Sequence, residues 1–110
     1  KYVIHAVGPI YQTHDSFVPQ QLASAYRRSM ELAEANSIRS ISFPSISTGA
    51  YGYPVEEAAP IALKAVIDYV LQHDHFDRIA FILFNEQIVE TYAHALTRLV
   101  QLNPDTIKSL

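Results

Sequence analysis

Three short runs of apolar and β-branched residues stand out along the chain, each followed by a longer stretch with helical spacing. The runs predict strands at residues 2–7, 38–43 and 78–84, because Gly, Pro, Asn, Asp or Ser residues lie close to their ends. The first run stops at Gly8-Pro9. The third, "RIAFILF", is apolar at every position after its arginine, which is typical of a parallel strand covered on both faces.

The stretches between and after these runs predict helices at residues 19–35, 55–73 and 86–102, with a loop at residues 11–18. Their apolar positions recur every three or four residues, so each helix has one face for a core. The positions assigned to these faces are Leu22, Ala25, Tyr26, Ser29, Leu32, Ala33, Ala58, Ala62, Ala65, Val66, Tyr69, Val70, Ile88, Val89, Tyr92, Ala95, Leu96, Leu99 and Val100.

Strands that alternate with helices predict an α/β domain: a mostly parallel sheet with right-handed crossovers and helices on both faces, as in a three-layer α/β/α sandwich. The 110 residues suffice for one domain or part of one. Lys1 leads at once into the first apolar run, so we expect a piece from inside a longer domain whose early strands are missing. Residues 1–102 would be folded and residues 103–110 would form a tail.

Composition narrows the function classes. Hydrophobic residues make up 49% and charged residues 17%, which excludes a disordered chain. The net charge of −3 and the lack of a basic patch disfavour nucleic acid as a partner. No apolar run reaches the length of a membrane span, and no secretory signal is recognisable. The absence of cysteine excludes disulfides and a thiol nucleophile, and agrees with a cytoplasmic location.

The stretch "FPSISTGAYGYP", which follows the second predicted strand, is the main candidate for a functional loop. Ligands of open parallel sheets bind beyond the carboxyl ends of the strands. Three segments leave those ends here, namely "GPIY", "SISTGAYG" and Phe84-Asn85. We therefore expect them to share one rim of the sheet.

The middle segment has the residues of an anion nest. Gly49 and Gly52 can adopt positive φ, so successive N–H groups from Ser47 to Tyr51 can converge on phosphate oxygens, with the Thr48 hydroxyl as a further donor. Gly and Ser serve a plain strand-to-helix turn equally well, and that alternative stays open. The segment matches neither the Walker pattern nor G-x-G-x-x-G, and its serines lie outside a G-x-S-x-G elbow.

The segments "YVIHAVGPIY", "RSISFPSISTGAYGYP" and "RIAFILFNE" together resemble the macrodomain family of the MacroD or Appr-1''-p processing type. The resemblance covers residues 2–99 and matches only the C-terminal part of that family. The aspartate that contacts adenine, the "NAAN"-like segment and the glycine-rich loop of the family have no counterpart here.

The resemblance implies a set of ligand-binding residues. The diphosphate-binding loop would comprise Ser47, Thr48, Gly49, Ala50, Tyr51 and Gly52. Tyr51 would also flank the distal ribose and is the candidate catalytic residue. Phe84 would stack on adenine, with Asn85 in a weaker role beside it. From the residues alone, Phe84 has a second interpretation, as the last apolar residue of a buried strand.

The implied function is ADP-ribose binding, with hydrolysis of ADP-ribosyl esters of proteins or of O-acetyl-ADP-ribose in the complete domain. The family needs no metal or cofactor for this. The rivals are a non-catalytic ADP-ribose reader and a truncated remnant without activity. An unpaired sheet edge would make a homo-oligomer an option. His5 is expected to be a hydrogen-bonded histidine in a buried strand rather than a base, and "HDH" at residues 73–75 a solvated helix end.

Overall fold

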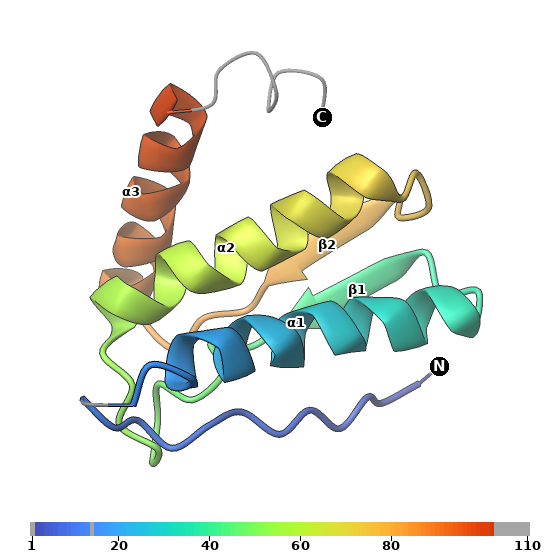
Figure 1. The fold of residues 1–110 in the computed structure, drawn as a ribbon. Helices are drawn as coiled ribbons and strands as arrows, with labels where there is room; N and C mark the ends of the chain where they lie inside the picture. The colour runs from blue at the N-terminus through green and yellow to red at the C-terminus, as the bar shows by residue number, and fades with distance from the viewer. Residues whose placement is uncertain (1, 14, 103–110) are drawn as a thin grey trace.

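The computed structural model describes residues 2–13 and 15–102. Its elements are α1 (Val18–Ala35), β1 (Ser40–Phe43), α2 (Val55–Gln72), β2 (Arg78–Phe81) and α3 (Glu86–Leu102), arranged as in Figure 1. The three helices agree with the sequence prediction to within one residue at each end. Both strands are shorter than expected, and the predicted tail at residues 103–110 lies outside the described residues.

The two strands form a parallel pair, with Ser40 opposite Arg78 and Phe43 opposite Phe81. The ladder continues past the end of β2, where the Ile82 N–H donates to the Phe43 carbonyl at 2.8 Å. Helix α2 connects the two strands, as a parallel crossover requires. The predicted α/β fold with a parallel sheet is therefore confirmed.

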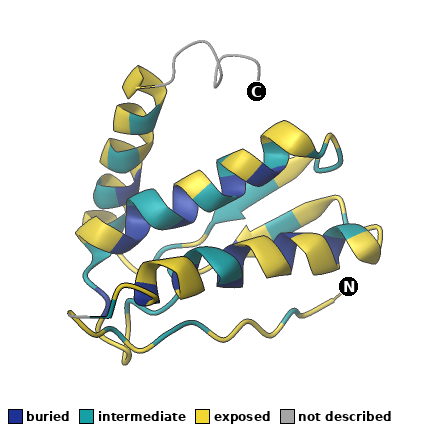
Figure 2. Cartoon of the chain, viewed as in Figure 1, coloured by how far each residue is buried: buried dark blue, intermediate teal, exposed yellow. Residues whose placement is uncertain are grey.

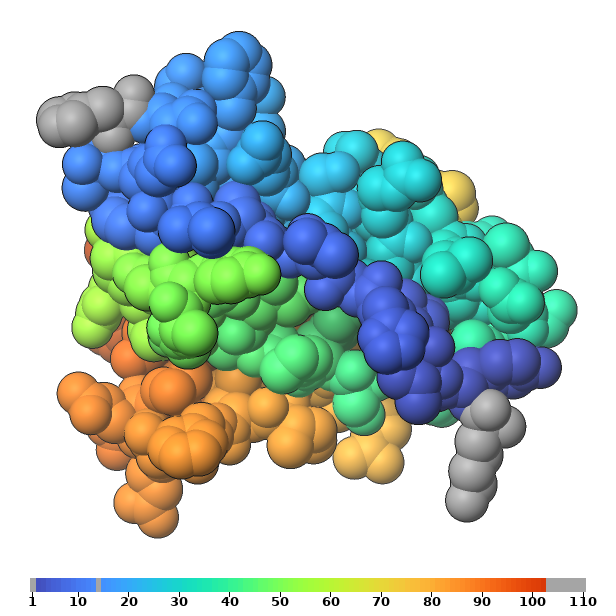
Figure 3. Space-filling view, turned by 90° about the horizontal axis from the view of Figure 1, so that it is seen from below, coloured from blue at the N-terminus to red at the C-terminus, as the bar shows by residue number. Residues whose placement is uncertain are grey.

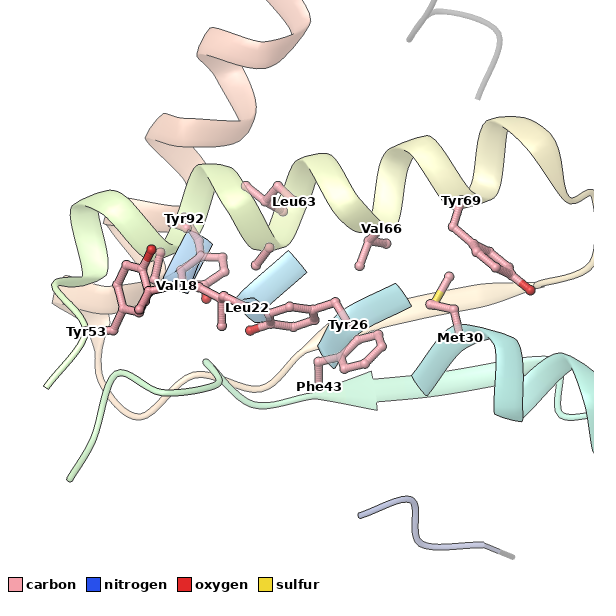
Figure 4. Close-up of a cluster of buried hydrophobic side chains, with 13 residues drawn as sticks. Val18, Leu22, Tyr26, Met30, Phe43, Tyr53, Leu63, Val66, Tyr69 and Tyr92 are labelled. Carbon is pink, nitrogen blue, oxygen red and sulfur yellow. The ribbon is translucent and has the colours of Figure 1, made fainter. Parts of the chain in front are cut away.

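The core lies between the sheet and the paired helices α1 and α2 (Figure 1). The buried residues of these helices face one another and the strands, while their outer faces are exposed (Figure 2). Tyr26 packs on Phe43 with ring centroids 5.2 Å apart, and Phe43 lies 5.7 Å from its cross-strand partner Phe81 (Figure 4). Tyr92 joins α3 to this cluster, with its ring 5.3 Å from Phe81. The opposite face of the sheet carries Ser40, Ser42 and Arg78, which are exposed.

Residues 2–7 do not form the predicted strand. They run in an extended conformation beside β1 without joining the sheet, which among the described residues contains only β1 and β2 (Figure 1). A strand forms only when its N–H and C=O groups pair with a neighbour, and no described strand lies next to this segment. The prediction for His5 was wrong for the same reason: its side chain is exposed rather than buried in a strand.

Within residues 2–13 and 15–102, none of the helices combines the length and the apolar character that crossing a bilayer would require.

Candidate functional site

The three segments expected on one rim meet at the same end of the molecule. The strand arrows of β1 and β2 point toward this end, where residues 44–54 and 82–85 leave the sheet (Figure 1). The Tyr11 N–H donates to the Tyr51 carbonyl at 3.0 Å, and the Tyr11 and Tyr53 rings lie 4.9 Å apart. These contacts tie the "GPIY" segment to the loop after β1, which Figure 3 shows from below with residues 2–13 in blue and the loop in green.

Gly8 allows the close approach of these two segments. A Cβ atom at this position would collide with the Ser47 Oγ and with the Cγ2 of Ile46. Both neighbours are side chains of the loop itself, so any larger residue at position 8 would displace it. Gly8 is thus a site residue that the sequence prediction placed on the rim without giving it a role.

The loop is closed by its own hydrogen bonds. The Tyr53 N–H donates to the Ser47 carbonyl at 2.9 Å, and the Gly52 N–H donates to the Gly49 carbonyl at 3.0 Å. Ser47 has φ 69° and Gly52 has φ 73°, so both lie in the left-handed region. Gly49 does not, and the expectation that it needs positive φ was wrong: the turn that reverses the chain is placed two residues earlier, at Ser47.

Four amides of the loop have no acceptor. Among the described residues, nothing accepts a hydrogen bond from the N–H groups of Ser47, Gly49, Ala50 or Tyr51. The Ser47 Oγ is buried and also lacks a partner. Gly49 has no atom within 4 Å of its Cβ position, so the space above the turn is open. Free amides, an unpartnered hydroxyl and open space are what an anion site of the nest type requires.

Two tyrosines that the sequence prediction assigned only to the core hold the base of this loop. The Tyr26 hydroxyl donates to the Pro44 carbonyl at 3.2 Å and accepts from the Ile46 N–H at 2.8 Å. The Tyr92 hydroxyl lies 2.7 Å from the Ser45 Oγ. The signal was present in the sequence, because a tyrosine at a core position of a helix needs a partner for its hydroxyl.

The tyrosines near the loop are held in their neutral form. Burial raises the pKa of Tyr26 far above its usual range, with a smaller contribution from Tyr92. Burial, followed by the charge of Glu57, also raises the pKa of Tyr11 and of Tyr53. These hydroxyls therefore act as hydrogen-bond donors and acceptors, and not as bases, near neutral pH.

The segment after β2 has a different character. Phe84 is 92% exposed, so its interpretation as the last residue of a buried strand was wrong. Asn85 begins α3: its Oδ1 accepts from the Ile88 N–H at 2.9 Å, which is the geometry of a helix cap. Neither side chain contacts the loop after β1 through a hydrogen bond or ring contact among those that the described residues make.

Metal-ligating residues do not gather at this site. In the described ranges, no group of three or more His, Cys, Asp or Glu side chains could hold a metal ion. His73 instead lies 3.2 Å from Glu34 and stacks on Tyr69, and the His75 Nε2 lies 2.8 Å from the Ile38 carbonyl oxygen. Both histidines thus have structural partners at the far end of α2.

Comparison with known proteins gives the family. The family model for the Macro domain matches residues 1–62. An O-acetyl-ADP-ribose deacetylase of Klebsiella pneumoniae (strain 342) is 46% identical over 94 residues, which is 86% of this chain and 54% of the relative. The chain thus spans about half the length of that relative.

Solved structures agree with the sequence match. The Oceanobacillus iheyensis macrodomain with ADP superposes with a TM-score of 0.82 at 40% identity, over 86% of this chain and 50% of that one. A Trypanosoma brucei macrodomain in complex with ADP-ribose superposes with a TM-score of 0.69 at 37% identity, over 71% of this chain and 34% of that one. Family match, sequence identity and shared fold lead to one conclusion: the chain belongs to the macro domain family and covers part of that domain.

Proposed function

We propose that the domain to which these residues belong binds ADP-ribose at the carboxyl end of its sheet. The observation that carries the proposal is the set of four free amides, at Ser47 and residues 49–51, around an open space. A diphosphate has the negative charge and the acceptor oxygens that such an array needs, and no lysine is required. Relatives solved with ADP or ADP-ribose bound support this choice of ligand.

The remaining contacts divide between the two ends of the ligand. Phe84 offers an exposed aromatic ring, one neighbouring strand away from the loop, on which adenine can stack. Tyr51 is 43% exposed and would lie along the distal ribose, while the Thr48 hydroxyl and Gly52 complete the loop. Asn85 would contribute beside adenine only through its free amide nitrogen, because its oxygen caps α3.

The proposed reaction is hydrolysis of an ester of ADP-ribose, either O-acetyl-ADP-ribose or an ADP-ribosyl ester of a protein side chain. Water adds to the ester carbonyl, the ester bond breaks, and a carboxylic acid and the free hydroxyl of ADP-ribose are released. The deacetylase name of the Klebsiella relative supports this step. Tyr51 is the candidate catalytic residue in the loop.

A non-catalytic reader of ADP-ribose is the second candidate. The described loop presents amides and hydroxyls, and the tyrosines around it are held neutral. Such groups bind a diphosphate well but do not by themselves activate water. This observation favours binding as the function of the described half of the domain.

Isothermal titration with ADP-ribose, ATP and NAD tests the ligand, and release of acetate from O-acetyl-ADP-ribose tests the reaction. We expect ADP-ribose to bind tightest of the three. Equal or tighter binding of ATP would contradict the proposed ligand. Tight binding of ADP-ribose without acetate release by the complete domain would contradict hydrolysis and leave the reader.

A further inference from the structure

A groove separates residues 2–6 from β1 and the residues that flank it. Its walls are residues 2–6 on one side and residues 38 and 40–44 on the other, with Ser29 of α1 and Ile46 also lining it, and its volume is about 730 Å³. In Figure 1 the two walls run in the same direction, from the N-terminal end of the segment toward the loop end of the molecule. Both walls are therefore extended backbone, and the groove lies in line with the sheet.

The β1 wall presents unpaired backbone groups to the groove. The carbonyls of Arg39 and Phe43 accept from residues at either end of β2, so the odd-numbered residues of β1 face β2. Because consecutive residues of a strand point their N–H and C=O groups to opposite sides, those of Ser40 and Ser42 face the groove. The sheet of the described residues ends at β1, so these groups have no strand partner.

The opposite wall has the composition of a buried strand but lies exposed. In "YVIHAV" every residue except His5 is apolar, and Val3 and Val7 are 82% and 85% exposed. None of residues 2–7 makes a backbone hydrogen bond to the described chain. A run of this kind is stable when strands pair with it and side chains cover it, and neither condition is met here.

We propose that this groove receives one β-strand, inserted between residues 2–7 and β1, from the part of the macro domain that these 110 residues do not cover. The described residues superpose on 50% of the Oceanobacillus iheyensis chain while 86% of this chain is matched, so half of a folded domain remains to be placed against them. The walls are five to seven residues long, which is the usual length of a strand. The inserted strand would pair with both walls and join residues 2–7 to the sheet.

The test uses this chain with a defined probe: the part of the Oceanobacillus iheyensis macrodomain that lies outside its match to this chain. Amide hydrogen exchange of the labelled chain is followed by NMR with and without the unlabelled probe. We expect the amides of Ser40 and Ser42, together with alternate amides in residues 3–7, to exchange at least about tenfold more slowly with the probe, since new ladder bonds would protect them.

Proline variants separate this groove from the other edge of the sheet. Ser42→Pro removes an N–H that faces the groove and should weaken probe binding at least about tenfold, whereas Ser42→Ala retains the N–H and should bind like the unchanged chain. On the other wall, consecutive amides point to opposite sides, so one of His5→Pro and Ala6→Pro should weaken binding and the other should not. These two positions lie outside the core, so their effect does not depend on whether Ser42→Pro folds.

Three results would overturn the proposal. Protection confined to the Ile79 and Phe81 amides would place the added strand on the outer edge of β2. Equal protection of Ser40 and Ser42 in the chain alone would assign the groove to a second copy. An absence of protection at both walls would show that no strand enters. None of these outcomes depends on ADP-ribose, so the groove and the proposed function can fail separately.

Discussion

The loop after β1 and the segment after β2 leave the same edge of the same parallel sheet, but they are held very differently. The loop is fixed by Tyr26 and Tyr92 at its base, by Gly8 against its side and by its own turn at Ser47. The segment after β2 has one anchor, the Asn85 cap of α3, and it carries Phe84 almost fully exposed.

The difference shows which half of a ligand site this chain builds by itself. Preorganised donors bind without an ordering cost, so the loop can hold a diphosphate as it stands. An exposed ring gains full stacking energy only when other groups complete the pocket around the base. The described residues therefore supply a finished diphosphate site and one wall of an adenine site.

The most sensitive way to break this comparison is Gly49→Val. Gly49 has open space around it and lacks positive φ, so valine should leave the fold intact and fill the space above the free amides. We expect ADP-ribose affinity to fall by about 100-fold, or about 2.7 kcal/mol, in a titration of the complete domain. Circular dichroism should show an unchanged melt.

The matched control is Gly52→Val at the other glycine of the loop. Because Gly52 has φ 73°, a β-branched residue there is strained and should lower the melting temperature, unlike Gly49→Val. Normal ADP-ribose affinity in Gly49→Val would mean that the loop is only a turn.

Tyr26→Phe tests whether the base of the loop is held as described. The substitution leaves the Ile46 N–H and the Pro44 carbonyl without their partner and should cost about 1–3 kcal/mol of unfolding free energy in urea. Tyr53→Phe is the control, because the Tyr53 hydroxyl has no hydrogen-bond partner among the described residues. Equal stability of the two variants would show that the tyrosine hydroxyl does not anchor the loop.

Phe84→Ala addresses the other half of the comparison. Loss of one aromatic ring under a base should weaken binding of ADP-ribose and of AMP alike, by about 1–3 kcal/mol, since both carry adenine. Stability should not change, because the ring is 92% exposed. Ile82→Ala, another exposed apolar residue of the segment, should leave both affinities unchanged. Unfolding of Phe84→Ala would place the ring in the core and the adenine site elsewhere.

Asn85→Ala is expected to have the smallest effect. Loss of the cap should lower the unfolding free energy by about 1 kcal/mol in thermal melts, and Asn85→Asp should retain it because a carboxylate oxygen caps equally well. If Asn85→Asp keeps both stability and ADP-ribose affinity, the residue acts as a cap only. A lower affinity at full stability would add the side-chain amide to the ligand site.

The helices were predictable and the outer strand was not, for one physical reason. The spacing of apolar residues in "VPQQLASAYRRSMELAEA" is a local property, and helix hydrogen bonds close within four residues. Residues 2–7 have an equally clear β composition, but their hydrogen bonds would have to come from another strand. A strand without its neighbour is an exposed extended segment, and no local pattern reveals that the neighbour is absent.

The candidate site divides in the same way. The residue types in "SISTGAYG" predicted a turn with donors after a parallel strand, and the structure brings this loop and the "GPIY" segment together at the predicted edge. The glycine pattern suggested the wrong residue for the reversal, because the left-handed position falls on Ser47. Local composition could not decide this, since hydrogen bonds from Tyr53 and a contact with Gly8 select the turn.

By itself, the sequence determined the three helices, the parallel order of β1 and β2 and the location of the donor-rich loop, because periodicity and loop chemistry are encoded within a few neighbouring residues. Only the tertiary structure decided which amides stay free, that Tyr26 and Tyr92 hold the loop, and that Phe84 is exposed. These features arise from contacts between residues 18 to 47 positions apart, and their energies depend on how the chain packs rather than on any local pattern.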